Sequence, residues 1–234
     1  MKHSCPGLEV VRHSQLDWTP GSPTSDPSSG DARTGVWRKV LAARGPEHDL
    51  VLCALVRWDR GLRLSPESRG AAEEILVLDG TLWDEQDALG RGSYVLTSPR
   101  EPRWLSTPDG CLLFVRSTRL EQDRGHTTLD TSRGVWESRG FAGARRQFLH
   151  LSEGAPEQMW LTRLAAGVQA PTVEMPHGEE LFVVEGAFTD EFGSFSQYDW
   201  LRFAPGMKHA PRTDSGCLLY VARDTRCAPP AGVR

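Results

Sequence analysis

The chain contains two copies of one sequence pattern at a constant spacing. The segment AEEILVLDGTLWDE, residues 72–85, aligns without a gap on GEELFVVEGAFTDE, residues 178–191, at an offset of 106 residues. The same offset brings DGCLLFV (109–115) onto SGCLLYV (215–221). A fixed internal period indicates a repeated structural unit. The 234 residues, a length compatible with one domain or two, are therefore predicted to form two copies of one domain.

The second copy is longer than the first near its beginning. The tripeptide GVW occurs at 35–37 and again at 134–136, an offset of 99, whereas Arg57 and Arg163 match at the offset of 106. The second copy has thus gained seven residues between its tryptophan and its arginine.

The composition between the repeats predicts the domain boundaries. Pro, Ser, Gly and Asp accumulate before the first copy and Pro in the tail, and such segments lack the apolar residues of a packed core. We predict an N-terminal arm, partly flexible, at 1–34, domain 1 at 35–120, a linker at 121–133, domain 2 at 134–226 and a tail at 227–234.

Both copies have the pattern of an all-β protein. Short apolar runs such as ILVL at 75–78 and LFVV at 181–184 are bounded by Gly, Asp and Pro, which terminate strands and form turns. The chain has 23 Gly and 16 Pro, enough for many such turns. No long amphipathic helical pattern occurs, so a closed sandwich or barrel is favoured over a sheet covered by helices.

Charge and composition exclude several functions. With 27 basic and 31 acidic residues the net charge is -4, without the basic excess that nucleic-acid binding normally needs. No apolar run approaches the roughly 18 residues of a membrane span. The five cysteines are odd in number and form no C-x-x-C pair, which favours a reducing compartment over a secreted disulfide scaffold. We expect a cytoplasmic protein with no nucleic-acid or membrane partner.

Three motifs of the second copy resemble a known family. The run GEELFVVEGAFTDEFG (178–193), PGMKH (205–209) and GCLLYV (216–221) resemble the motifs of the cupin superfamily, most closely the cupin half of zinc-binding anti-sigma factors of the ChrR type. The DWTP segment (17–20) before GVW is also similar to the beginning of such two-cupin chains. The resemblance implies two tandem cupin barrels, each a double-stranded β-helix or jelly roll.

The resemblance also implies a metal site and shows where this chain departs from it. In cupins two histidines of H-x-H, the first Glu of G-E-E and the His of P-G-x-x-H hold a metal. In domain 2 the H-x-H positions are Val173 and Met175, and the remaining candidate ligands are His177, Glu179 and His209. Imidazole and carboxylate ligands suit zinc or iron, so we expect one divalent metal, Zn or Fe, in domain 2.

Domain 1 retains less of the ligand set. Of the family ligands only Glu73 is present, with arginines at two former histidine positions, Arg69 and Arg103. The resemblance therefore implies no metal in domain 1. These three residues predict either an internal ion pair that replaces the metal or a site for a small anionic ligand, because arginine recognises carboxylates and phosphates with two parallel hydrogen bonds.

The other polar residues with reactive side chains receive structural interpretations. We expect the acidic pairs after the strands to be solvent-facing turn residues, the two equivalent cysteines to be packing residues and the scattered histidines to have no role. These are Asp84, Glu85, Asp190 and Glu191; Cys111 and Cys217; and His3, His13, His48, His126 and His150.

Three classes of function remain open. The first is a non-catalytic, ChrR-like module that binds a small-molecule ligand or a metal and transmits its state to a partner. The second is a metal-dependent small-molecule enzyme of the dioxygenase-like cupin type, and the third is a structural bicupin that mainly dimerises. We favour the first. A homodimer is expected because cupins commonly dimerise, whereas sigma-factor binding is not expected because the H-x-x-x-C-x-x-C pattern of the zinc anti-sigma domain does not occur.

Overall fold

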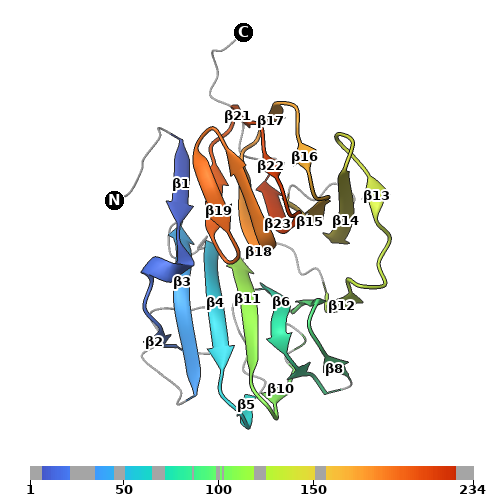
Figure 1. Cartoon of the computed structure of the whole chain (residues 1–234). Helices are drawn as coiled ribbons and strands as arrows, with labels where there is room; N and C mark the ends of the chain where they lie inside the picture. Colours follow the sequence, from blue (N-terminus) through green and yellow to red (C-terminus); the bar gives the residue numbers. More distant parts are fainter. Residues whose placement is uncertain are drawn as a thin grey trace. The chain divides into compact units, whose positions relative to one another are not determined.

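The computed structural model describes residues 7–21, 35–44, 51–64, 72–85, 87–98, 101, 103–118, 125–150 and 157–224. This part of the chain consists of β-strands and a single 3₁₀ turn, η1 (His13–Gln15), so the all-β prediction is confirmed (Figure 1). It divides into two compact units, a first unit of Ser14–Gly134 and a second unit that combines Met1–His13 with Val135–Arg234. No helix among the described residues is long and apolar enough to cross a membrane.

The first unit contains a large and a small antiparallel sheet. The large sheet has the order β12-β9-β6-β11-β4-β3-β2 and the small one the order β5-β10-β7-β8. Their strands are β2 (Thr19–Pro20), β3 (Val36–Arg44), β4 (Val51–Trp58), β5 (Leu62–Leu64), β6 (Ala72–Gly80), β7 (Leu82–Trp83), β8 (Ala88–Leu89), β9 (Ser93–Leu96), β10 (Leu105–Thr107), β11 (Cys111–Thr118) and β12 (Thr127–Asp130).

The second unit repeats this arrangement. Its large sheet has the order β1-β20-β18-β23-β15-β14-β13. In a smaller group, β16 pairs with β22, and the end of β18 pairs with both β22 and β19. The short strands β17 and β21 form a separate two-stranded sheet. The strands are β1 (Leu8–Val11), β13 (Glu137–Ser138), β14 (Ala144–His150), β15 (Glu157–Leu164), β16 (Val168–Gln169), β17 (Val173–Met175), β18 (Glu179–Asp190), β19 (Gly193–Ser196), β20 (Trp200–Phe203), β21 (Met207–His209), β22 (Arg212–Thr213) and β23 (Cys217–Asp224).

Each unit has its own core between its two sheets. Side chains alternate between the two faces of a strand, so every second residue of β18 and β23 points inward, as do Leu181 and Val183. Met175, Phe188 and Phe195 close the same core from the smaller strands. The face of the large sheet that bears this core is called the inner face below, and the opposite face is the outer face.

The ranges predicted for the arm and the linker both contain strands. In the second unit β1 pairs with β20, with Leu8 opposite Phe203, and the Leu8 side chain is buried in the core. In the first unit β12 pairs with β9, with Thr128 opposite Val95. Burial of Leu8 holds β1 to its sheet, whereas β12 has no buried residue and is held by its pairing with β9. The polar composition around them indicated neither strand. The predicted tail lies outside the described residues.

Two glycines of the second unit offer a matched test of how tightly the strands pack at their ends. Gly186 and Gly167 both have positive φ, 73° and 76°. A Cβ at Gly186 would lie 2.2 Å from the carbonyl oxygen of Gly216, whereas a Cβ at Gly167 would meet nothing within 4 Å. We predict that Gly167→Ala costs about 1–2 kcal/mol from φ alone and that Gly186→Ala costs clearly more. Urea denaturation of both variants measures the difference, and equal losses would contradict the close approach.

Candidate functional site

Two of the three residues predicted to bind metal in the second unit, Glu179 and His209, contact different acidic or basic side chains. His177 is half-buried in the turn between β17 and β18, and Glu179 is the first residue of β18. The carboxylate of Glu179 accepts hydrogen bonds from Nε of Arg223, at 3.1 Å, and from Nη2 of the same side chain. Arg223 stands directly across the strand pair, since Glu180 pairs with Ala222 in the antiparallel register. The predicted ligand Glu179 is thus one half of an ion pair.

His209 ends β21 and is held by a second buried acid. Its Nδ1 lies 3.0 Å from Oδ2 of Asp190, whose side chain is completely buried. The other oxygen of Asp190 accepts the backbone N–H of Phe192 at 2.8 Å. The imidazole ring packs against Phe203, with the ring centroids 4.7 Å apart. Packing and this contact fix His209 in the core.

The residues present do not fit a metal centre. Val173 and Met175 stand at the two positions where cupins have histidines, and Met175 is fully buried in the core. Among the described residues no group of three or more His, Cys, Asp or Glu side chains is placed to hold a metal ion. The carboxylate of Glu179 is bonded to Arg223, whereas the contact of Asp190 with Nδ1 of His209 leaves Nε2 of that ring available.

Two arginines on the inner face of the second unit surround a buried tryptophan. The guanidinium carbons of Arg146, on β14, and Arg223, on β23, lie 5.1 and 4.9 Å from the ring centroid of Trp160. The indole N–H of Trp160 donates to Oγ1 of Thr162 at 3.0 Å. Arg146 and Arg223 are called the arginine pair below. Neither was singled out from the sequence, because their proximity depends on the pairing of β14, β15 and β23.

The arginine pair carries more positive charge than its surroundings compensate. Glu179 is bonded to Arg223, whereas Nε of Arg146 is buried and has no hydrogen-bond partner among the described residues. Burial lowers the pKa of Arg146, the nearby Glu179 raises it, and Arg223 lowers it. Arginine nevertheless stays protonated in proteins. The site can therefore stabilise an added anion.

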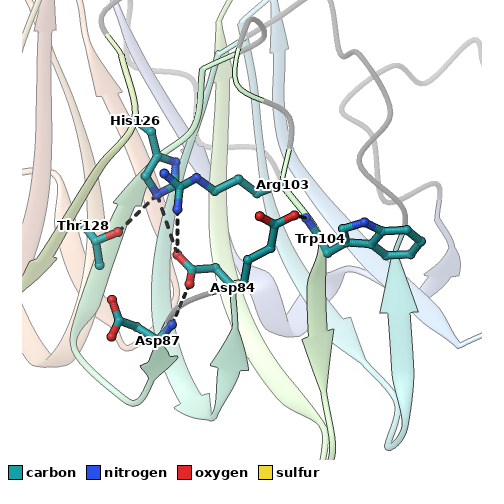
Figure 2. Close-up of polar contacts among 7 residues, drawn as sticks. Asp84, Asp87, Arg103, Trp104, His126 and Thr128 are labelled. Carbon is teal, nitrogen blue, oxygen red and sulfur yellow. Dashed lines mark hydrogen bonds and ion pairs between the residues drawn. The ribbon is translucent and has the colours of Figure 1, made fainter.

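The first unit has a different polar cluster at the corresponding end of its small sheet. Figure 2 shows Asp84, after β7, with Arg103 and His126 pointing toward it. Oδ2 of Asp84 lies 3.9 Å from Nη1 of Arg103 and 3.7 Å from Nε2 of His126. Oδ1 of Asp84 accepts the backbone N–H of Asp87 at 2.8 Å, and Thr128 lies 3.3 Å from Nε2 of His126.

The two acids occupy the same position of the repeat, and the prediction for both was wrong. Asp84 and Asp190 are separated by 106 residues and are buried, whereas we expected solvent-facing turn residues. Their partners Arg103 and His209 are also 106 residues apart. A buried carboxylate needs a hydrogen-bond or charge partner, which explains why both positions have a basic side chain beside the acid. An acid and a base at equivalent positions in both copies were the sequence signal for this contact.

Of the residues predicted in domain 1, the structure describes Glu73 and Arg103, and each has its own contacts. Glu73 is buried on β6, and its backbone N–H donates to Oγ1 of Thr97 at 3.0 Å. Arg103 has Asp84 as its acidic neighbour, so the internal ion pair at this position uses Asp84. Arg69 lies outside the described residues. The anionic-ligand site proposed for Arg69, Glu73 and Arg103 stays a prediction.

His126 was also missed, because it matches no ligand spacing. Its side chain is 8% exposed, and its Nδ1 is buried without a hydrogen-bond partner among the described residues. Burial and Arg103 lower the pKa of His126, and Asp84 and Glu101 raise it by a smaller amount. A neutral imidazole is therefore favoured in the folded protein.

The equivalent cysteines behave as packing residues, as predicted. Cys111 and Cys217 are buried in the two cores. Burial raises the pKa of the Cys111 thiol to about 11, against a smaller lowering effect of its hydrogen bond with Thr107, and raises that of Cys217 to about 12. Protonated thiols are poor nucleophiles and poor metal ligands.

Comparison with known proteins identifies the fold and the family. A family model described as the ChrR cupin-like domain matches residues 8–121 and 124–225. Among solved structures, a candidate dioxygenase from Nostoc punctiforme has a TM-score of 0.77 at 13% identity and covers 98% of this chain and 86% of its own. A bacterial pirin from Escherichia coli in complex with nickel(II) has a TM-score of 0.64 at 10% identity, covering 95% of this chain and 99% of its own.

An oxalate decarboxylase also shares the fold. Its TM-score is 0.64 at 10% identity, and the match covers 95% of this chain and 78% of that chain. At such identities the likeness establishes the fold alone. No curated protein matches the sequence of this chain.

The lowered pKa of His126 predicts a pH dependence of stability. In the unfolded chain His126 binds a proton near pH 6.5, whereas in the folded protein it does so only at lower pH. The contribution of His126 to the free energy of unfolding is therefore complete above about pH 6.5. It is lost as the pH falls toward the folded pKa. In His126→Asn the first unit should lose this part of its acid sensitivity. Urea midpoints at several pH values between 7.5 and 5 measure the slope, and identical slopes in both proteins would contradict the assignment.

Proposed function

The chain belongs to the family of ChrR cupin-like domains, and from that premise we propose that it is a non-catalytic module that binds a small organic anion in its second barrel and signals its occupancy to a partner. The second barrel is the second unit defined above. The arginine pair beside Trp160 supplies the binding groups. The observation that carries the proposal is the buried Nε of Arg146, which has no hydrogen-bond partner among the described residues.

The chemistry of the arginine pair selects the class of ligand. A guanidinium presents parallel N–H donors that match the two oxygens of a carboxylate or phosphate. In a partly buried site these charge-assisted hydrogen bonds are screened less by water than on the surface. Trp160 adds a fully buried aromatic ring next to both guanidiniums. A carboxylate attached to a small planar or apolar body satisfies both features.

The same geometry argues against metal-dependent catalysis in this barrel. A cupin metal needs several imidazole and carboxylate ligands, whereas Val173 and Met175 replace two histidines and Glu179 is bonded to Arg223. An enzyme of the dioxygenase-like cupin type is the alternative, and it would require the Glu179–Arg223 contact to open around a metal, with His209 binding through Nε2. The fold is shared with a candidate dioxygenase and an oxalate decarboxylase, so the alternative deserves a direct measurement.

The ligand-binding proposal predicts the effect of removing one guanidinium. Arg146→Met keeps an unbranched apolar side chain at this position and removes the guanidinium with its charge and donors. We expect it to weaken the binding of benzoate, used as a probe, by about tenfold or more, the effect of losing charge-assisted hydrogen bonds. Isothermal titration calorimetry measures the affinity. Arg202→Met is the matched control, because Arg202 lies on β20 and its acidic neighbour is the exposed Glu9 at 3.7 Å.

Metal analysis of the same preparations separates the alternative. For protein purified without chelator, the proposal predicts less than stoichiometric metal and benzoate binding that persists after chelation. Stoichiometric metal that is lost in His209→Ala would support the metal-dependent alternative. Benzoate binding that is equal in the parent and in Arg146→Met would contradict the proposed site.

A further inference from the structure

Four side chains form a row across the outer face of the second unit. Arg145 on β14 pairs with Arg163 on β15, Arg163 with Leu218 on β23, and Leu218 with Glu185 on β18. Because their sequence neighbours Ala144, Leu164 and Cys217 belong to the core, this row points away from it. Neighbouring strands are about 4.8 Å apart, so the row runs from two cations across an apolar side chain to an acid. It is called the outer row below.

A cavity lies over the outer row. It has a volume of about 510 Å³ and is lined by all four side chains together with the turns at Ala165, Ala166 and Ser215. The turn glycines Gly143, Gly186 and Gly216 also line it. Gly186 cannot be replaced without a clash, since a Cβ there would lie 2.2 Å from the carbonyl oxygen of Gly216. The end of the cavity is therefore built of closely packed backbone.

The two arginines of the outer row have no acidic partner among the described residues. Like charges directly opposite each other on an antiparallel pair are destabilising. Nη2 of Arg145 donates to the carbonyl oxygen of Trp136 at 3.1 Å, and the guanidinium of Arg163 lies 5.3 Å from the Trp136 ring centroid. Neither contact neutralises a charge. The juxtaposition of the two cations thus favours an anion between them.

The first unit shows the same row without the second arginine. There Trp37, Arg57, Leu112 and Asp79 pair in the same order across β3, β4, β11 and β6. The guanidinium of Arg57 lies 5.0 Å from the ring centroid of Trp18 and 5.6 Å from that of Trp37, and Asp59 is 3.9 Å away. Arg57 is therefore covered by aromatic rings and has an acid beside it.

The insertion in the second copy accounts for the difference. Seven added residues between the tryptophan and the arginine place Trp136 before β13 and bring Arg145 opposite Arg163, at the position that Trp37 has opposite Arg57. The exchange replaces an aromatic side chain by a cation. It also leaves Arg163 exposed.

We propose that the outer row and its cavity bind a small carboxylate with a short apolar body. The carboxylate lies between Arg145 and Arg163, and the apolar body covers Leu218 toward Glu185. This site is on the outer face, whereas the arginine pair of the proposed function is on the inner face. The inference is therefore independent of that function and can fail or hold separately.

Butyrate and inorganic phosphate serve as the probes for this site. Side-chain Nε–Hε signals of arginine in NMR spectra report each guanidinium directly. We expect butyrate to shift the signals of Arg145 and Arg163 saturably, with an affinity about tenfold weaker in Arg145→Gln. Arg57→Gln, the same row position in the first unit, and Arg146→Met, on the inner face, should leave butyrate binding at the outer row unchanged.

Arg145→Gln is also expected to fold normally, because it removes a like-charge contact. Its urea midpoint should equal or exceed that of the parent protein. If the Arg145 and Arg163 signals do not shift with butyrate up to about 50 mM, roughly the weakest affinity a two-arginine site would give, the site is overturned. It is also overturned if Arg145→Gln binds butyrate with the same affinity as the parent protein. Phosphate that binds more tightly than butyrate would overturn the choice of a carboxylate with an apolar body.

Discussion

Charged side chains buried inside the two units need polar or charged partners, and the proposed ligand binding rests on this constraint. Taking an ionised group out of water costs several kcal/mol unless a partner compensates it. Asp190 is therefore bonded to His209, Glu179 is bonded to Arg223, and Asp84 lies beside Arg103 and His126. The Glu179 pair uses a carboxylate that a cupin metal would otherwise need. Among the described residues the buried Nε of Arg146 has no hydrogen-bond partner, and the proposed anion in the second barrel rests on this group.

The fold could be predicted from the sequence because the repeat, the strand pattern and the family motifs all point to the same structure. The candidate ligands Glu179 and His209 were implied by the family motifs, and they lie at the start of β18 and the end of β21. Their partners could not be predicted. Arg223 reaches Glu179 only through the pairing of β18 with β23, and His126 reaches Asp84 from the segment interpreted as a linker. Such contacts depend on strand register and not on spacing along the chain.

Comparing the two copies explains how one fold acquired different polar sites. At the position of the last cupin histidine the first unit has Arg103 and the second has His209, and each lies beside the equivalent acid. On the outer face an insertion of seven residues exchanges a tryptophan for Arg145 in an otherwise similar row. The acid is thus common to both copies, while the proposed anion binding of the second unit rests on arginines that differ between them.

The most direct test is a crystal structure of the protein, purified without chelator and grown with 4-bromobenzoate, with data collected at the bromine absorption edge. We predict an anomalous peak beside Trp160, with the carboxylate bonded to Arg146 and the Glu179–Arg223 ion pair intact. A metal ion bonded to Glu179 and to Nε2 of His209, with Glu179 released from Arg223, would contradict the central claim.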